Sequence, residues 1–167
     1  MKKMLDLYIK ENFEKEEKVK LFNRFNILKS AIFEEEEIEC LESSSVKNFI
    51  ESNKDNNIFK NLLFSYIDNK GLKDSDVYNK VHIDRRLFSK IRNDDSYHPS
   101  RDTVILFGFA LELNEDEIDG LLQSASYSLS KNNYFDLIIR FCFINKIYNL
   151  IEVNELLDSY GCKMFNY

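Results

Sequence analysis

The sequence predicts an all-α protein. Only four glycines and one proline occur in 167 residues, whereas an all-β fold needs many more residues of these types in its turns. Apolar residues recur at three- and four-residue steps in several segments, as one face of an amphipathic helix requires. Residues that favour helix ends flank most of these segments. A chain of this length can bury a substantial apolar core, as one domain or as a small module with an additional lobe.

The first 57 residues are predicted to form an N-terminal helical lobe. Between residues 18 and 33 the apolar side chains fall on one helix face, so this segment should pack against another element. The acidic run Glu34–Glu37 ends that pattern, and the polar stretch 52–57 is the best candidate for a linker. We interpret the acidic run as a solvated helix end, although it is also the kind of surface that binds a basic partner.

Residues 58–130 contain the signals of five short helices in close succession. Each predicted helix has either a side chain that can accept a hydrogen bond from its first turn or a glycine that can end its last turn. The connections between these helices are short, which predicts one five-helix unit. The predicted capping or terminating residues are, in chain order, Gly71, then Asp74 or Ser75, then Asp84, Ser100, and Asn114 with Glu117.

Residues 131–167 are predicted to form a C-terminal helical extension. The segment 134–146 is apolar on almost all sides, so we expect it to be buried, either against the five-helix unit or in an oligomer interface. A last helix is expected to end at the glycine in position 161. The predicted organisation is therefore an N-terminal lobe (1–57), a central module (58–130) and this extension.

Two phrases of the central module carry a recognisable pattern. They read LKDSDVYNKVHIDRRLFSKIRN and HPSRDTVILFGFALELNEDEI, and they resemble the second to fifth helices of the Xre/Cro/C1-repressor type of helix-turn-helix domain. The resemblance spans residues 58–124, and Pro99 with Ser100 matches the proline-containing start of the family's fourth helix. It implies a five-helix lambda-repressor-like fold. The residues that match the family's apolar core are Val77, Val81, Ile83, Phe88, Ile91, Val104, Phe107, Ala110, Leu111, Leu113 and Ile118.

The resemblance implies a DNA-binding transcriptional regulator of the Xre type, which would bind double-stranded DNA as a homodimer. The helix Arg85–Arg92 would then be the recognition helix, whose N-terminal residues enter the major groove. Arginine suits this position because its planar fork can donate two hydrogen bonds to one guanine. The expected base-reading residues are Arg85, Arg86 and Ser89, and the expected phosphate contacts are Lys90 and Arg92.

The distribution of charge agrees only in part with DNA binding. The net charge of the protein is −6, but residues 58–98 hold 8 basic and 6 acidic residues, a local excess of positive charge. These basic residues are also compatible with a solvated helix face, in which Arg92 merely pairs with Asp94 or Asp95. Both interpretations remain open at the level of the sequence.

Three residues of the second predicted helix and its turn depart from the family pattern. Asp74 stands where the family often has a glutamine that bonds a DNA phosphate, and its charge would repel that phosphate. Tyr78 replaces a small residue, which demands a changed packing against the next helix. His82 replaces the glycine of the turn, where histidine tolerates a positive φ better than most residues. Asp74 and Tyr78, together with the net charge of −6, favour a second hypothesis, in which the helix-turn-helix scaffold binds a protein.

Under this second hypothesis, the working surfaces are the acidic N-terminal lobe and the aromatic C-terminal helices. Such a protein would be an antitoxin, or a phage- or plasmid-encoded inhibitor of a host defence nuclease of the CRISPR type. An inhibitor of a guided nuclease can use its acidic groups to occupy a basic nucleic-acid channel.

The sequence contains no recognisable catalytic constellation. It has no glycine-rich phosphate loop, no nucleophile elbow and no paired acid and base. The two histidines, His82 and His98, lack cysteine or carboxylate partners at ligand spacing, so neither predicts a metal site. We therefore expect a protein that is not an enzyme and binds neither a metal nor another cofactor.

The sequence also predicts a cytoplasmic protein. Its three cysteines, Cys40, Cys142 and Cys162, are widely spaced among apolar residues, as expected of core residues in a reducing compartment. Charged residues such as Asp6 and Lys10 interrupt the apolar run that a secretory signal would need near the N-terminus. No segment approaches the length and apolarity of a membrane span, so no membrane contact is expected.

Overall fold

The computed structural model describes residues 4–8, 46, 48 and 57–166, and every regular element in this part of the chain is helical. The expected all-α class is confirmed for these residues. The predicted helix at 18–33, the acidic run and nearly all of the predicted linker lie outside them, as does Cys40. None of the described helices is long and apolar enough to cross a membrane. The labelled helices are α3 (Ile58–Asn69), α4 (Asp74–Lys80), α5 (Arg85–Asn93), α6 (Arg101–Ala110), α7 (Glu115–Ser124), α8 (Tyr134–Ile144) and α9 (Leu150–Asp158).

Polar side chains and a glycine fix several helix ends where the sequence predicted them. Ser100 Oγ accepts a hydrogen bond from the backbone N–H of Thr103 (3.3 Å) at the start of α6. At the start of α7, Asn114 and Glu117 exchange hydrogen bonds between side chain and backbone, 2.8 and 3.0 Å long. Gly71 takes a φ of +63° after α3, a conformation that glycine adopts without strain. These predicted helix ends are confirmed.

The start of α4 differs from the prediction. The residue that precedes the helix is Lys73, and Asp74 is already helical, so neither Asp74 nor Ser75 caps α4. The Asp76 carboxylate instead accepts a hydrogen bond from the backbone N–H of Lys73 (3.2 Å). Residues 74–76 all carry hydrogen-bonding side chains. Because the third of them bonds to the backbone of Lys73, the helix begins at Asp74, one residue earlier than a cap at Asp74 would allow.

The apolar residues that match the family's core are all buried, with at most 8% of any one exposed to solvent. Phe88 of α5 lies at the centre of an aromatic cluster. Its ring is edge-on to Phe64 of α3 and to Phe107 of α6, each at a centroid distance of 5.8 Å. Tyr78 of α4 lies 5.5 Å from the same ring, so the larger residue in α4 packs directly against α5. This cluster joins four helices of the central module.

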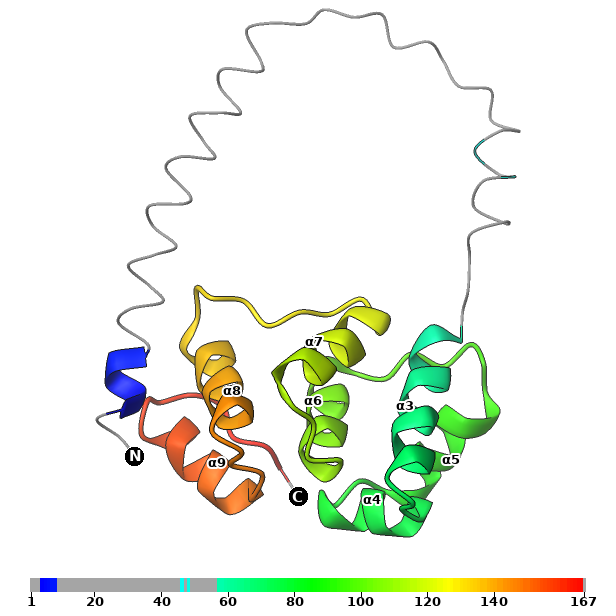
Figure 1. The fold of residues 1–167 in the computed structure, drawn as a ribbon, viewed down its shortest axis with the longest axis horizontal. Coiled ribbons are helices and arrows are strands. Elements are labelled where there is room, and N and C mark those ends of the chain that lie inside the picture. The colour runs from blue at the N-terminus through cyan, green and yellow to red at the C-terminus, as the bar shows by residue number, and fades with distance from the viewer. Residues whose placement is uncertain (1–3, 9–45, 47, 49–56, 167) are drawn as a thin grey trace, which may run out of the picture.

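The two C-terminal helices continue the same core. Figure 1 shows α8 and α9 on one side of α6 and α7, with α3, α4 and α5 on the other side. The ring of Phe143 in α8 stacks on Phe109 in α6 at a centroid distance of 4.5 Å. Arg140 of α8 pairs with Glu115 and Asp119 of α7 at 2.8 and 2.9 Å. The segment predicted to be buried is therefore packed against the five-helix unit, within one hydrophobic core that extends from α3 to α9.

The short helical segment near the N-terminus also packs on the C-terminal helices. Leu5 is fully buried, and the ring of Tyr8 lies 5.8 Å from that of Phe141 in α8. The hydroxyl of Tyr160, just after α9, donates a hydrogen bond to the carboxylate of Asp6. The two ends of the chain therefore contribute to one layer beside the central module.

Candidate nucleic-acid interface

A sharp turn joins α4 to α5. His82 takes a φ of +54° in this turn, as predicted from the residue that replaces the family's glycine. The backbone N–H of Ile83 donates to the carbonyl oxygen of Tyr78 (2.9 Å), which closes the end of α4. The Asp84 carboxylate then accepts a hydrogen bond from the backbone N–H of Arg86 (2.6 Å) and caps α5. The predicted conformation of the turn and the predicted cap of α5 are both confirmed.

One side of α5 is packed in the core and the other side is open to solvent. Phe88 and Ile91 are only 3% and 2% exposed and anchor the helix in the core. The helical period turns most of the remaining residues outward. We name this exposed side the α5 face, and it consists of Arg85, Arg86, Ser89, Lys90, Arg92 and Asn93. The five residues predicted to contact DNA are thus all brought together on it.

Asn93 is the member of the α5 face to which the sequence assigned no role. It is the last residue of α5 and lies one residue beyond Arg92, where the recognition helix was predicted to end. Its Nδ2 donates hydrogen bonds to the carbonyl oxygen and Oγ of Ser89 (2.9 and 3.1 Å). Asn93 follows Ser89 by four residues and Arg86 by seven, and this spacing places the three on one stripe of a helix. This spacing, which is visible in the sequence, could have identified Asn93 as a member of the exposed face.

The N-terminal half of the α5 face carries two unneutralised cations. Arg85 and Arg86 are exposed, and neither forms an ion pair with any residue that the structure describes. Their guanidinium donors are therefore available to a ligand. Further along the helix, Lys90 Nζ lies 4.5 Å from the ring centroid of Tyr97, a cation–π contact that leaves the ammonium near the surface.

The predicted pairing of Arg92 with Asp94 or Asp95 is wrong. The Asp94 carboxylate accepts two hydrogen bonds from Ser96 (3.0 and 2.6 Å), and these bonds lower its pKa. The Asp95 carboxylate pairs with Lys60 of α3 at 2.6 Å. Both carboxylates are therefore engaged with groups outside α5.

Arg92 is held instead by α3 and α4. Its Nη2 donates to Oδ1 of Asp74 at 2.6 Å. Its guanidinium carbon lies 4.0 Å from the ring centroid of Phe64. The side chains of Arg92 and Asp74 remain 45% and 37% exposed, so this contact lies at the surface, where the first turn of α4 meets the last turn of α5.

The acidic stretch from residue 112 to residue 119 is largely used inside the protein. Glu112 pairs with Lys80 of α4 at 2.5 Å. Arg140 of α8 binds both Glu115 and Asp119. Intramolecular cations therefore offset much of the negative charge that α7 and the residues before it bring to the central module.

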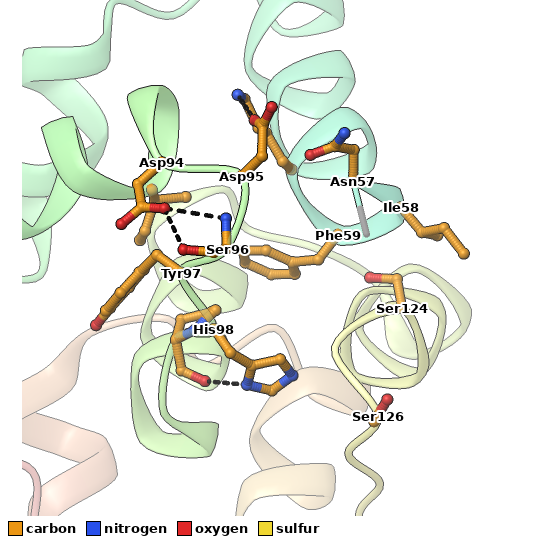
Figure 2. Close-up of a pocket in the computed structure, with 13 residues that line it drawn as sticks. Asn57, Ile58, Phe59, Asp94, Asp95, Ser96, Tyr97, His98, Ser124 and Ser126 are labelled. Atoms are coloured by element: carbon orange, nitrogen blue, oxygen red, sulfur yellow. Dashed lines mark hydrogen bonds and ion pairs between the residues drawn. The ribbon is translucent and has the colours of Figure 1, made fainter. Parts of the chain in front are cut away.

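A pocket of about 360 Å³ lies beside the C-terminal end of α5 (Figure 2). It is lined by the start of α3, by Ile91 and by the loop 94–99. His98 belongs to this loop, where its Nδ1 lies 3.1 Å from the carbonyl oxygen of Pro99. No group of three or more potential metal-ligating side chains occurs in the described part of the chain. His98 is accounted for by the polar loop in which the sequence placed it.

The two described cysteines are not activated thiols. Cys142 is fully buried in α8, and burial raises its pKa to about 12. Burial also raises the pKa of Cys162, which is only half-buried. Because the thiolate is the nucleophilic form of cysteine, a raised pKa lowers the fraction of the reactive form of both side chains at neutral pH.

The α5 face thus combines exposed cations with hydrogen-bonding serine and asparagine side chains on a firmly anchored helix. Comparisons with protein-family models, curated proteins and solved structures found no match to this chain.

Proposed function

We propose that the protein is a DNA-binding transcriptional regulator of the Xre type, with α3–α7 as a lambda-repressor-like helix-turn-helix module. In this proposal α5 is the recognition helix, and α4 lies across the DNA backbone. The observation that carries the proposal is the pair Arg85 and Arg86. These two exposed side chains stand at the start of α5 and have no ion-pair partner among the described residues.

The chemistry of the α5 face fits the major groove, which is about 12 Å wide and admits one helix. Arg85 and Arg86 donate to guanine O6 and N7, and Ser89 donates or accepts one turn later. Asn93 extends this readout because its amide can pair with an adenine edge. Lys90 contacts phosphate as a flexible point charge. The buried side of α5 supports these contacts because it keeps the helix fixed while the exposed side binds.

A homodimer would strengthen this contact. Two copies of α5 would enter successive major grooves about 34 Å apart and read two half-sites of a palindromic site. The second half-site then binds at a high effective concentration, so two moderate contacts give a tight complex.

The proposal is tested by selecting duplexes from a randomised library with the full-length protein and measuring their affinity by gel shift at several salt concentrations. The double variant R85A/R86A should bind at least about tenfold more weakly, since one bidentate arginine–guanine contact contributes roughly 1–3 kcal/mol. The control K131A/K163A removes two exposed lysines outside α5 and should change the affinity much less. Binding that ignores R85A/R86A, or that lacks a salt dependence, would sink the proposal.

A protein-binding function is the second candidate, and the contact between Arg92 and Asp74 favours it. That contact neutralises one of the four cations on the α5 face and so weakens its attraction for DNA. The partner would then be a toxin, or a host defence nuclease of the CRISPR type that a phage or plasmid needs to inhibit. Copurification of one protein in a fixed ratio, together with the absence of a DNA footprint, would decide for this candidate.

A further inference from the structure

Arg92 is the cation of the α5 face that has an ion-pair partner among the described residues. Its Nη2 lies 2.6 Å from Asp74 Oδ1, and its guanidinium lies against the ring of Phe64. Arginine uses the same donors and the same planar geometry for carboxylates and for phosphates. The Asp74 carboxylate therefore occupies a donor that a DNA phosphate would otherwise use.

We propose that Asp74 is a brake on DNA binding, because its carboxylate takes the place of a backbone phosphate at Arg92. This inference rests on the proposed function of the α5 face. The brake has two components. The carboxylate engages Arg92, and its negative charge also repels a phosphate that approaches the first turn of α4.

The surroundings of the pair make the brake reversible. Both side chains are partly exposed, so water and DNA can reach the contact. Exposed ion pairs are weak, and salt screens them further. Phe64 faces the guanidinium of Arg92 and keeps it beside Asp74 in the free protein. Phe64 also packs on Phe88, the buried anchor of α5, so the position of Arg92 is coupled to the core.

Removing the charge of Asp74 should therefore strengthen DNA binding. The substitution Asp74→Asn keeps the size of the side chain but removes its charge, so the remaining amide oxygen competes only weakly with a phosphate for Arg92. Each phosphate contact changes the logarithm of the binding constant by about 0.9 per tenfold change in salt. One added contact then makes the salt slope steeper by about 0.9. If the contact contributes nothing at about 1 M salt, the gain in affinity near 0.1 M salt is about eightfold.

The experiment compares full-length wild type, D74N, R92A and D74N/R92A on one fluorescein-labelled duplex of mixed sequence, about 20 bp long. A phosphate contact is independent of sequence, so this probe is sufficient. Fluorescence anisotropy gives the dissociation constant at KCl concentrations from about 50 to 200 mM. The control D102N removes an equal charge from α6, where Asp102 pairs with Lys163 at 3.1 Å. Circular dichroism and thermal unfolding establish that each variant is folded.

The expected result is a several-fold gain in affinity for D74N and little change for D102N. In the R92A background D74N should give a much smaller gain, because only the relief of charge repulsion then remains. A wild type that binds through Arg85 and Arg86 but gains nothing, or loses affinity, on D74N overturns the brake and leaves the proposed function standing. A gain that persists in full in D74N/R92A also overturns it, since the effect would then not act through Arg92. If folded wild type and D74N both fail to bind DNA at the lowest salt, the proposed function is overturned and the brake with it.

Discussion

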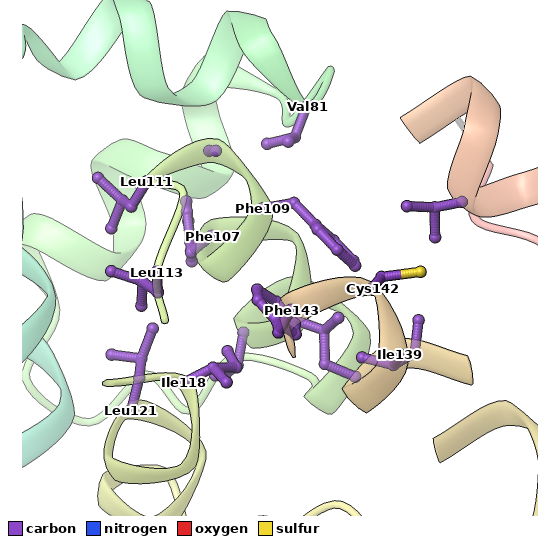
Figure 3. Close-up of a cluster of buried hydrophobic side chains, with 14 of the residues drawn as sticks. Val81, Phe107, Phe109, Leu111, Leu113, Ile118, Leu121, Ile139, Cys142 and Phe143 are labelled. Atoms are coloured by element: carbon purple, nitrogen blue, oxygen red, sulfur yellow. The ribbon is translucent and has the colours of Figure 1, made fainter. Parts of the chain in front are cut away.

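Gly108 lies where side chains of α7 and α8 press against α6. A Cβ atom at this position would lie 2.4 Å from Cδ1 of Ile118 and 2.9 Å from Cζ of Phe143. Figure 3 shows these two side chains gathered in the core between the helices. Protein interiors are close-packed, so neither neighbour can move away without disturbing others. An added Cβ must therefore displace the end of Ile118 or the ring of Phe143 within the packed core, and we expect this cost to exceed the gain from the higher helix preference of alanine.

The substitution G108A is expected to destabilise the protein by about 1–3 kcal/mol, the typical cost of overpacking a core. The matched control is G120A in α7, where an added Cβ meets no atom within 4 Å. That variant is expected to gain about 0.4–1 kcal/mol, because alanine loses less conformational entropy on folding than glycine does. Urea unfolding measures both. Equal effects of the two substitutions would show that Gly108 is not confined as described.

Single residues were predictable from the sequence where a local pattern determines their environment, and were not predictable where tertiary packing does. Phe88 and Ile91 were expected in the core because they match the apolar core of the family that the sequence resembles, and both are buried. The partner of Arg92 was not predicted, since Asp74 lies 18 residues away and reaches it only through the packing of α4 on α5. Asn93 was missed for a simpler reason, because α5 continues past the position where the sequence ended it.

Helix ends were predictable where one side chain dominates the local hydrogen bonding. Ser100 stands alone before α6 as a side chain able to cap its first turn, and it does so. The start of α4 has three consecutive residues whose side chains can bond to the backbone of its first turn. Asp76, the last of the three, forms that hydrogen bond. The turn between α4 and α5 was also predictable, because His82 was the one residue expected to take a positive φ there, and it does so.

The turn at His82 should therefore be sensitive to the shape of the side chain. The substitution H82V is expected to destabilise the protein by about 1–2 kcal/mol, because a β-branched residue is strained at a φ of +54°. The variant H82G should stay within about 1 kcal/mol of wild type, since glycine accepts this φ but is more flexible when unfolded. Thermal unfolding of the two variants provides the comparison. A valine variant as stable as the glycine variant would contradict this account of the turn.

The central module and the C-terminal extension meet in one continuous core. The predicted boundary at residue 130 separates them in sequence, but Phe109 and Phe143 stack across it. A buried charge crosses the boundary as well. The side chain of Asp136 in α8 is only 3% exposed, and it accepts hydrogen bonds from Arg101 Nη2 of α6 (2.5 Å) and from the backbone N–H of Ser130 (2.7 Å). This carboxylate connects α6, the chain before α8, and α8 itself.

Removing Arg101 should lower the free energy of unfolding by more than the removal of a residue from an exposed ion pair does. The substitution R101A leaves the Asp136 carboxylate buried without its cation, which costs about 3–5 kcal/mol in buried pairs. The Arg101 side chain is 28% exposed, so we expect a loss near the lower end, about 3 kcal/mol. The control K163A breaks the exposed pair with Asp102 and should cost less than about 1 kcal/mol.

Urea unfolding of both variants, together with D136N and R101A/D136N, completes a double-mutant cycle. A neutral amide at position 136 no longer needs the cation, so the double variant should be less destabilised than the sum of the two single variants. If R101A costs no more than K163A, the contact between α6 and α8 does not hold the extension to the module. In the expected case the loss applies to the whole molecule, and R101A lowers the free energy of unfolding in one cooperative transition.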